Sequence, residues 1–204
     1  MLFRSGHSIA IMGESGSGKS TLARLMIGLE RPSEGRVLIN GVDTTKWGLR
    51  EWRKYRGKIQ AVFQDAGGTL NPSWSTSKNV EEALVNLTDL SPSQRKNRIA
   101  ELMEQTGLSK SLLDTPVRKL SGGEQRRLAL LRSLSISPEF LILDEVTAGL
   151  DLISTEAVLQ LLEKYEQEHD CAYLVITHDI QVASRLCEVI CEIEHGKFTK
   201  KAVR

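Results

Sequence analysis

The sequence predicts an α/β fold with a mostly parallel β-sheet. Short apolar segments rich in Ile, Val, Leu and Phe recur along the chain, and several lack the polar alternation of half-exposed strands. Segments with helical periodicity lie between them, and this alternation is typical of parallel sheets. The 204 residues suffice for one domain with a substantial core.

The expected strands are residues 8–12, 36–39, 59–63, 140–143, 173–176 and 189–193. Helical spacing i, i+3, i+4, i+7 relates Leu22, Leu25, Met26 and Leu29. Between about residues 73 and 137 the patterns are helical only. We interpret residues 73–137 as a helical subdomain inserted into a core formed by residues 1–72 and 138–204, so that residues 1–204 form a single domain.

Charge and cysteine content limit the classes of function that fit this chain. Lys and Arg number 27, Asp and Glu number 26, and the net charge is +1, which excludes binding to nucleic acid or membrane by bulk charge. The apolar runs are too short for direct membrane insertion. Three cysteines favour buried thiols in a reducing compartment over a disulfide framework or a zinc site.

The segment GESGSGKS at residues 13–20 fits the phosphate-loop pattern G-x-x-x-x-G-K-[ST] in full. A predicted strand leads into it and a predicted helix begins at Lys19, so backbone N–H groups and the helix dipole would face a phosphate. A dinucleotide-binding loop is excluded, because position 21 is not the third glycine. The residues expected to contact the nucleotide are Gly13, Ser15, Gly16, Ser17, Gly18, Lys19, Ser20 and Thr21.

Two carboxylates, Asp144 and Glu145, end the apolar strand at residues 140–143. Strand alternation points them in different directions. Asp144 can hold Mg²⁺ through water, while Glu145 can polarise a water for in-line attack on a γ-phosphate. Such a pair at the end of a strand is a weak signal alone. Together with the phosphate loop, it favours a catalytic role for these two carboxylates.

The segment LSGGE at residues 120–124 resembles the signature motif of the ATP-binding subunits of ABC transporters, with Glu124 as a tolerated variant in the last position. Gln64 resembles the Q-loop glutamine of that family, residues 148–151 resemble its D-loop, and His178 resembles its switch histidine. These motifs stand in the family's order and span nearly the whole chain. The chain is therefore identified as a member of this family.

The resemblance implies a P-loop ATPase that uses ATP and Mg²⁺. In the family two chains pack head to tail, and each ATP lies between the phosphate loop of one chain and the signature of the other. The residues expected at the partner chain's nucleotide are Ser121, Gly122, Gly123 and Asp151. The expected catalytic residues are Glu145, His178 and Gln64, with His178 contacting the γ-phosphate and orienting Glu145. The expected metal ligands are Ser20, Gln64 and Asp144.

Two segments indicate the subfamily. Residues 65–72 resemble a stretch of the peptide/nickel importers, and residues 20–30 look most like the second ATP-binding subunit of nickel importers. This implies a motor on the cytoplasmic face of a bacterial membrane that drives uptake of peptide, nickel or a metal chelate. The implied partners are membrane permease subunits and a second ATP-binding subunit, identical or paralogous. Trp74 is either an anchor for a membrane-subunit helix or a local core residue.

Other functions fit less well. A non-transport ABC ATPase acting on DNA or ribosomes would have long coiled coils, a zinc module or two cassettes, and a small-molecule kinase would not explain residues 121–123 or His178. Trp47, Trp52 and Tyr55 alternate with basic residues, which favours a solvated helix over a nucleic-acid surface.

Two departures from the family pattern are visible. Val146 stands where the family has a proline after the catalytic glutamate, which removes a restraint on φ without removing the hydrolytic groups. Residues 2–8 match the stretch just before the phosphate-loop strand, so we expect the family's N-terminal strands to be absent. The sole aromatic residue before Lys19 is Phe3, so ATP should be held mainly by its triphosphate.

Overall fold

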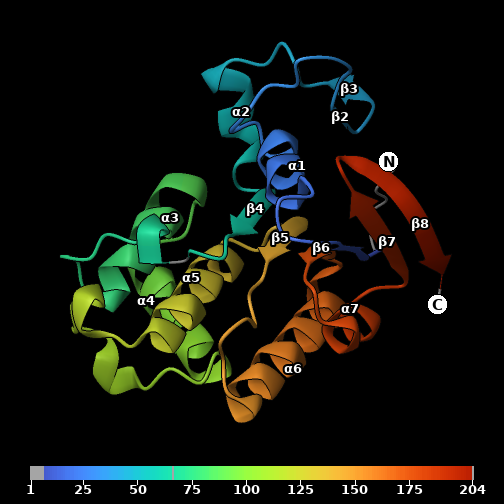
Figure 1. The fold of residues 1–204 in the computed structure, drawn as a ribbon. Coiled ribbons are helices and arrows are strands. Elements are labelled where there is room, and N and C mark those ends of the chain that lie inside the picture. Colours follow the sequence, from blue (N-terminus) through green and yellow to red (C-terminus); the bar gives the residue numbers. More distant parts are fainter. Residues whose placement is uncertain (1–6, 66, 204) are drawn as a thin grey trace.

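The computed structural model describes residues 7–65 and 67–203 (Figure 1). A six-stranded sheet has the order β4-β5-β6-β1-β7-β8, and all its pairings are parallel except that of β7 with β8. Its strands are β1 (Ile9–Met12), β4 (Ile59–Val62), β5 (Phe140–Asp144), β6 (Ala172–Ile176), β7 (Val189–Glu194) and β8 (Lys197–Val203). The predicted α/β fold with a mostly parallel sheet is confirmed.

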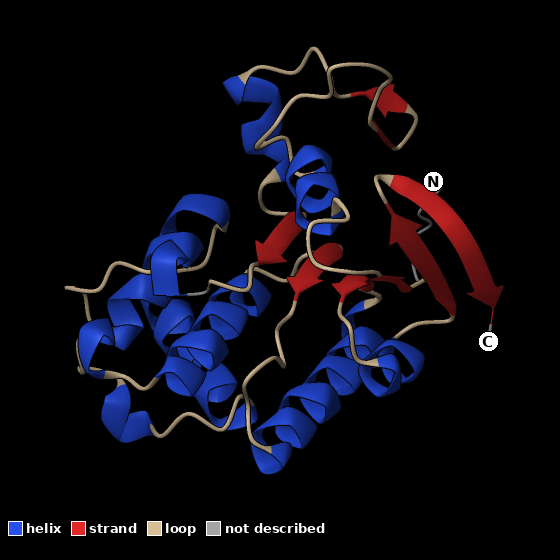
Figure 2. Ribbon diagram, in the orientation of Figure 1, coloured by secondary structure: helices blue, strands red, loops and turns tan. Residues whose placement is uncertain are grey.

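Helices lie on both faces of this sheet and beside it (Figure 2). The helices are α1 (Lys19–Met26), α2 (Leu49–Tyr55), α3 (Thr76–Leu87), α4 (Pro92–Gln105), α5 (Gly122–Ser135), α6 (Leu152–His169) and α7 (Ile180–Leu186). Short 3₁₀ turns are η1 (Gly67–Thr69), η2 (Lys110–Leu112) and η3 (Val117–Lys119). Helices α3, α4 and α5 form a group next to the β4 end of the sheet, whereas α1 and α6 lie on opposite faces (Figure 1).

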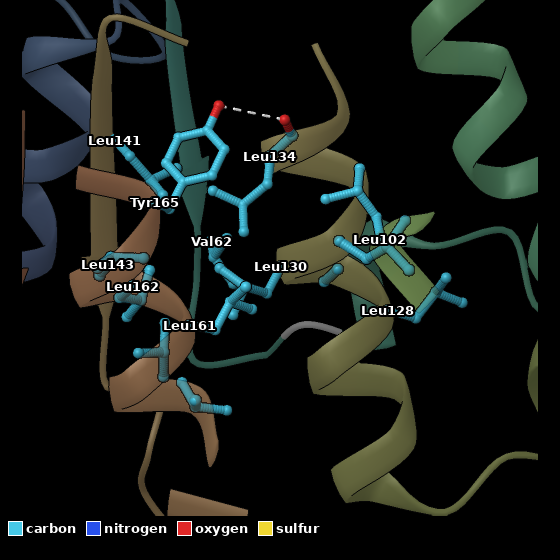
Figure 3. Close-up of a cluster of buried hydrophobic side chains, with 14 of the residues drawn as sticks. Val62, Leu102, Leu128, Leu130, Leu134, Leu141, Leu143, Leu161, Leu162 and Tyr165 are labelled. Atoms are coloured by element: carbon cyan, nitrogen blue, oxygen red, sulfur yellow. Dashed lines mark hydrogen bonds between the residues drawn. The ribbon is translucent and has the colours of Figure 1, made fainter. Parts of the chain in front are cut away.

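Side-chain alternation along the strands assigns the two faces. Ile142 of β5 and Leu174 of β6 pack with Ala23 and Ile27 near α1, in one buried cluster. The alternate strand residues belong to a second, larger cluster that includes leucines of α5 and α6. Figure 3 shows Leu141 and Leu143 there, with Leu161 and Leu162 from α6 and Leu130 and Leu134 from α5. The buried Tyr165 hydroxyl donates to the Leu134 carbonyl at 3.3 Å.

Two hairpins differ from the sequence expectation. Residues 36–39 were expected as a strand of the main sheet, but β2 (Leu38–Ile39) pairs with β3 (Val42–Asp43) in a separate antiparallel hairpin. Asn40 and Gly41 between them both have positive φ, which is the turn that an Asn-Gly pair favours. The edge strand β8 was missed, because its sequence, with three lysines, lacks the apolar pattern of a buried strand.

The helix α2 was expected before β4 and is present, but its aromatic residues are not solvated as predicted. Trp52 is 8% exposed and lies 5.1 Å, centroid to centroid, from Trp47. Gly28 has φ +69°, and a Cβ there would lie 2.1 Å from the Trp52 ring. The chain therefore leaves α1 at this point, and Leu29 is exposed instead of completing the predicted apolar stripe.

Three further expectations concern burial and the N-terminus. All three cysteines are buried, as predicted. Among the described residues, no helix is both long and apolar enough to cross a membrane. The expectation about missing N-terminal strands depends partly on Phe3, which lies outside the described residues.

Candidate nucleotide-binding and catalytic site

The phosphate loop joins β1 to α1 through glycines whose backbone conformations other residues adopt only with strain. Gly13, Gly16 and Gly18 all have positive φ, and a Cβ on Gly13 would lie 2.3 Å from the Ile193 carbonyl oxygen. Gly18 is the N-cap of α1 and provides no side-chain acceptor. The first N–H groups of α1 are therefore left for an external acceptor, such as a phosphate.

Lys19 crosses back over this loop. Its Nζ donates to the carbonyl oxygens of Gly13 and Glu14, at 2.7 Å each. These acceptors are neutral, and a phosphate oxygen would accept a stronger, charge-assisted bond. On the other side of the loop, the Gly196 N–H in the β7–β8 turn donates to the Ser17 carbonyl at 3.0 Å. The loop is thus supported from the sheet while its lysine stays available to a ligand.

Asp144 ends β5 directly beside α1. It is 4% exposed, and the Ser20 hydroxyl donates a hydrogen bond to it. Burial raises the pKa of Asp144, and the bond from Ser20 opposes this shift. A hydroxyl and a carboxylate are the oxygen ligands that Mg²⁺ takes in proteins, with phosphates and waters completing its shell. The pair therefore fits Mg²⁺, although the described residues contain no group of three or more acidic, His or Cys side chains that could hold a metal alone.

Glu145 follows in a backbone conformation that non-glycine residues seldom adopt. Its φ is +53°, and its N–H donates to the Ile176 carbonyl at 2.9 Å, which fixes the residue to the end of β6. Its Oε1 lies 2.9 Å from Nδ1 of His178, the residue that follows β6 by two positions. This bond and the carboxylate charge raise the pKa of His178. Val146, in place of the family's proline, is buried in the larger core cluster, so packing restrains the position that follows Glu145.

The signature motif lies at the start of α5. Ser121 is the N-cap, and its hydroxyl accepts the Glu124 N–H at 3.3 Å. In return, Oε2 of Glu124 accepts the Ser121 N–H at 2.7 Å and the Ser121 hydroxyl at 2.8 Å. These bonds lower the pKa of Glu124. The departure at position 124 therefore places an ionised carboxylate on the signature serine.

Asp151 is the N-cap of α6 and accepts the N–H and hydroxyl of Ser154, at 2.9 and 2.7 Å. These bonds lower the pKa of Asp151. Gln64 is exposed in the loop after β4. Trp74 is half-buried, with the Lys78 ammonium 4.6 Å from its ring centroid, so both hypotheses for this residue stay open.

The structure thus brings together some of the predicted site residues and not others. The phosphate loop, Asp144, Glu145 and His178 meet at the carboxyl ends of β1, β5 and β6. No hydrogen bond or ion pair recorded for the described part of the chain joins residues 121–123 or Gln64 to this group. The unusual φ of Glu145 was missed from sequence, because nothing in its residue type indicates it.

Comparisons with known proteins agree with this arrangement. Residues 1–148 match the family model described as ABC transporter. A nickel import ATP-binding protein NikE from Rhodospirillum rubrum is 36% identical over 97% of this chain and 71% of its own length. The NikE protein of Escherichia coli (strain K12) is also 36% identical, over the whole of this chain and 76% of its own.

Solved structures show the same fold. A dimeric ATP-binding cassette, MJ0796, bound to ADP and Pi superposes with a TM-score of 0.93 at 32% identity, covering 100% of this chain and 88% of that one. The cassette cbiO1 of Clostridium perfringens, part of the transporter complex cbiONQ, gives a TM-score of 0.85 at 30% identity and covers 100% and 79%. The chain belongs to the ABC transporter family. Within it, this chain is an ATP-binding and hydrolysing subunit of an importer.

Proposed function

We propose that this subunit hydrolyses ATP with Glu145 as the residue that activates water and His178 as its orienting partner. The observation that carries the proposal is the Glu145–His178 contact of 2.9 Å, formed by a glutamate held in a left-handed conformation beside the phosphate loop. Backbone strain at a functional residue is retained when the surrounding structure fixes it. Here the Ile176 carbonyl and the buried Val146 do so.

The chemistry then follows from the placement of the groups. The N–H groups of residues 13–20 and Lys19 would bind the β- and γ-phosphates, and Ser20 and Asp144 would hold Mg²⁺, which would supply charge neutralisation. Glu145 accepts a proton from a water whose oxygen forms a bond to the γ-phosphorus as the bond to the ADP oxygen breaks. His178 orients Glu145 through the Oε1–Nδ1 contact. Gln64 is proposed as a further ligand of Mg²⁺ or water once its loop approaches.

The second ATP-binding subunit would pack head to tail, so that residues 121–123 and Asp151 of one chain face the nucleotide of the other. Two observations support this. The signature is the N-terminus of a 14-residue helix, whose dipole favours an anion and is partly offset by the Glu124 carboxylate, and no hydrogen bond among the described residues connects it with its own phosphate loop. The similar cassette MJ0796 is itself dimeric.

The cargo is proposed from the relatives. Both NikE proteins carry nickel import in their names, so nickel or a nickel chelate is the first candidate, and a peptide is the second. The membrane subunits would hold this chain on the cytoplasmic face, where ATP is present.

A hollow of about 610 Å³ is the proposed dock for a short cytosolic helix of a membrane subunit. Arg50, Arg53 and Lys54 of α2 line one side of it and residues 85–89 line the other. Val85 is 52% exposed there. Three cations and one carboxylate, that of Asp89, surround an exposed apolar residue, and this excess of positive charge fits an amphipathic helix with acidic side chains.

The proposal is tested with the complete transporter in vesicles. ATP hydrolysis should be stimulated by Ni²⁺ or a nickel chelate with the cognate binding protein. Stimulation by peptides alone would instead identify the cargo as a peptide. Arg53→Glu should weaken binding of the membrane subunits without changing ATP binding, whereas Lys164→Glu on α6, a matched charge change, should not. A complex that forms equally well with both variants would contradict the dock.

A further inference from the structure

Two arginines of α5 bind the segment that follows Glu145. Arg126 donates from Nη1 to the Ala148 carbonyl, and Arg127 donates from Nη1 to the Ser154 hydroxyl at 3.2 Å. Ser154 in turn donates to Asp151 at 2.7 Å. Helix α5 is therefore bonded to the middle of the connection between β5 and α6 and to the first turn of α6.

Packing strengthens this junction. A Cβ built on Gly123 would lie 3.5 Å from Cδ2 of Leu150, an ordinary van der Waals contact, so Leu150 covers the signature glycine. The turn also holds itself, because the Ala148 N–H donates to the Glu145 carbonyl at 3.1 Å. Ala148 is thus bonded on one side to Glu145 and on the other to Arg126.

We propose that Arg126 is a positioning residue that couples the signature motif on α5 to Glu145 of the same chain. This inference rests on the proposed function, in which the signature of one chain contacts the ATP bound to the partner chain. Binding of that ATP would then affect Glu145, the water-activating residue of the chain that carries the signature. Arg126 lies five residues after Ser121 on a continuous helix, about 7 Å along the axis. A displacement of the helix start therefore moves the guanidinium and the Ala148 carbonyl with it.

The chemistry of the guanidinium suits this role. Its planar fork can hold more than one acceptor, whereas an ammonium is a point charge. Nε of Arg126 is buried and has no hydrogen-bond partner among the described residues. The side chain therefore keeps a spare buried donor, and a small shift of the turn can satisfy it. The contact between Arg126 and Ala148 can therefore exist in two arrangements, and binding of the partner's nucleotide would favour the second one.

The chain offers a matched control. Arg95 on α4 also donates from Nη1 to a backbone carbonyl, that of Leu90 at 2.6 Å, and its Nε lies 3.5 Å from Oε1 of Glu81, so its substitution also removes an ion pair. It lies outside α5 and the turn after Glu145. Arg126→Met and Arg95→Met each remove one guanidinium and keep an apolar stem, and Arg126→Lys retains a donor if the methionine variant folds poorly.

Hydrogen exchange on the full chain without nucleotide tests the contact. In Arg126→Met the amides of Ala148 and Leu150 should exchange about tenfold faster, which is the loss expected for one charged hydrogen bond. They should not change in Arg95→Met. Equal exchange in the wild type and Arg126→Met would overturn the proposal whatever the activity of the protein.

Turnover by the complete transporter tests the coupling. Arg126→Met should lower kcat about tenfold with KM for ATP unchanged, and Arg126→Lys should lie between. An unchanged kcat, or an equal fall in Arg95→Met, would overturn the positioning role. If the wild type shows no hydrolysis that Lys19→Ala abolishes, the proposed function fails instead, and the exchange result alone decides the contact.

Discussion

The phosphate loop and the signature are both glycine-containing helix starts, but they are capped in opposite ways. The N-cap of α1 is Gly18, which has no side chain, and the first turn of α1 has no acidic residue. The N-cap of α5 is Ser121, and Glu124 in its first turn closes a reciprocal capping box. One helix therefore leaves its N–H groups to a ligand, whereas the other already has an internal anion next to its N-terminus.

This difference separates the two sites functionally. Lys19 donates to two neutral carbonyls, which a phosphate can displace. Ser121 donates both its N–H and its hydroxyl to the Glu124 carboxylate, which repels a phosphate. The phosphate loop should therefore bind ATP in the isolated chain, while the signature should contribute only when a second chain brings a nucleotide to it.

The largest expected effect lies in the chemical step, outside both phosphate sites. Glu145→Gln keeps the shape of the side chain but removes the base, so turnover should fall by about 10²–10⁴. ATP binding should persist, because neither the phosphate loop nor the signature changes. Steady-state hydrolysis by the complete transporter and nucleotide binding by the variant are the two measurements. Near-normal turnover would show that another group activates the water.

A smaller effect concerns the cap of α5. Glu124→Ala should lower the free energy of unfolding by about 1 kcal/mol and the melting temperature by about 2–4 °C, whereas Glu124→Gln, which can also close a capping box, should change it little. Thermal unfolding of the purified chain measures this. In the complete transporter, Glu124→Gln should lower KM for ATP, because the repulsion is removed while the cap is kept. A raised KM would indicate that the carboxylate assists the nucleotide.

The cap also has a pH signature of known sign. Because folding lowers the pKa of Glu124, its contribution to stability is present above the unfolded pKa and is lost as pH falls through the folded pKa. The wild type should therefore lose more stability between neutral and acidic pH than Glu124→Gln. Unfolding midpoints in urea at several pH values would show the difference. Parallel pH profiles for the two proteins would mean that Glu124 does not hold Ser121.

The smallest effect is spectroscopic and concerns His178. Its pKa should lie above the ordinary value of about 6.5, because the Glu145 carboxylate accepts a hydrogen bond from the imidazole and its negative charge stabilises the protonated ring. In Glu145→Gln it should fall toward that value. An NMR titration of the imidazole, assigned with His178→Gln, is sufficient. If the pKa of His178 is the same in Glu145→Gln as in the wild type, the two residues do not interact in solution.

The sequence predicted the phosphate loop and the sheet well, because both depend on local patterns. The eight residues 13–20, the apolar strand before them and the amphipathic helix after them specify their own conformation, and each strand beside β1 was predicted. The hairpin at Asn40–Gly41 does have a local signal, which is the Asn-Gly pair itself. The edge strand β8 had no such signal. It is formed by pairing with β7, and its own sequence lacks the apolar content that would predict a strand.

The catalytic geometry was less predictable. Residue types suggested Glu145 and His178, but the left-handed backbone of Glu145 depends on the Ile176 carbonyl at the end of another strand. The bond from Arg126 to Ala148 joins residues 22 positions apart and follows from how α5 packs on the core. The burial of Trp52 required the contact with Gly28, which a reading of charge alternation does not detect.

Calorimetric titration of ATP into the isolated chain is the most direct test of the division between the two sites. Lys19→Ala should weaken binding about 10- to 100-fold, the value of a charged hydrogen bond to phosphate, whereas Ser121→Arg should bind ATP as the wild type does. The same Ser121→Arg change should abolish ATP-dependent association with the second ATP-binding subunit. An equal loss of ATP binding in the two variants would contradict the account, because it would place the signature at the chain's own nucleotide.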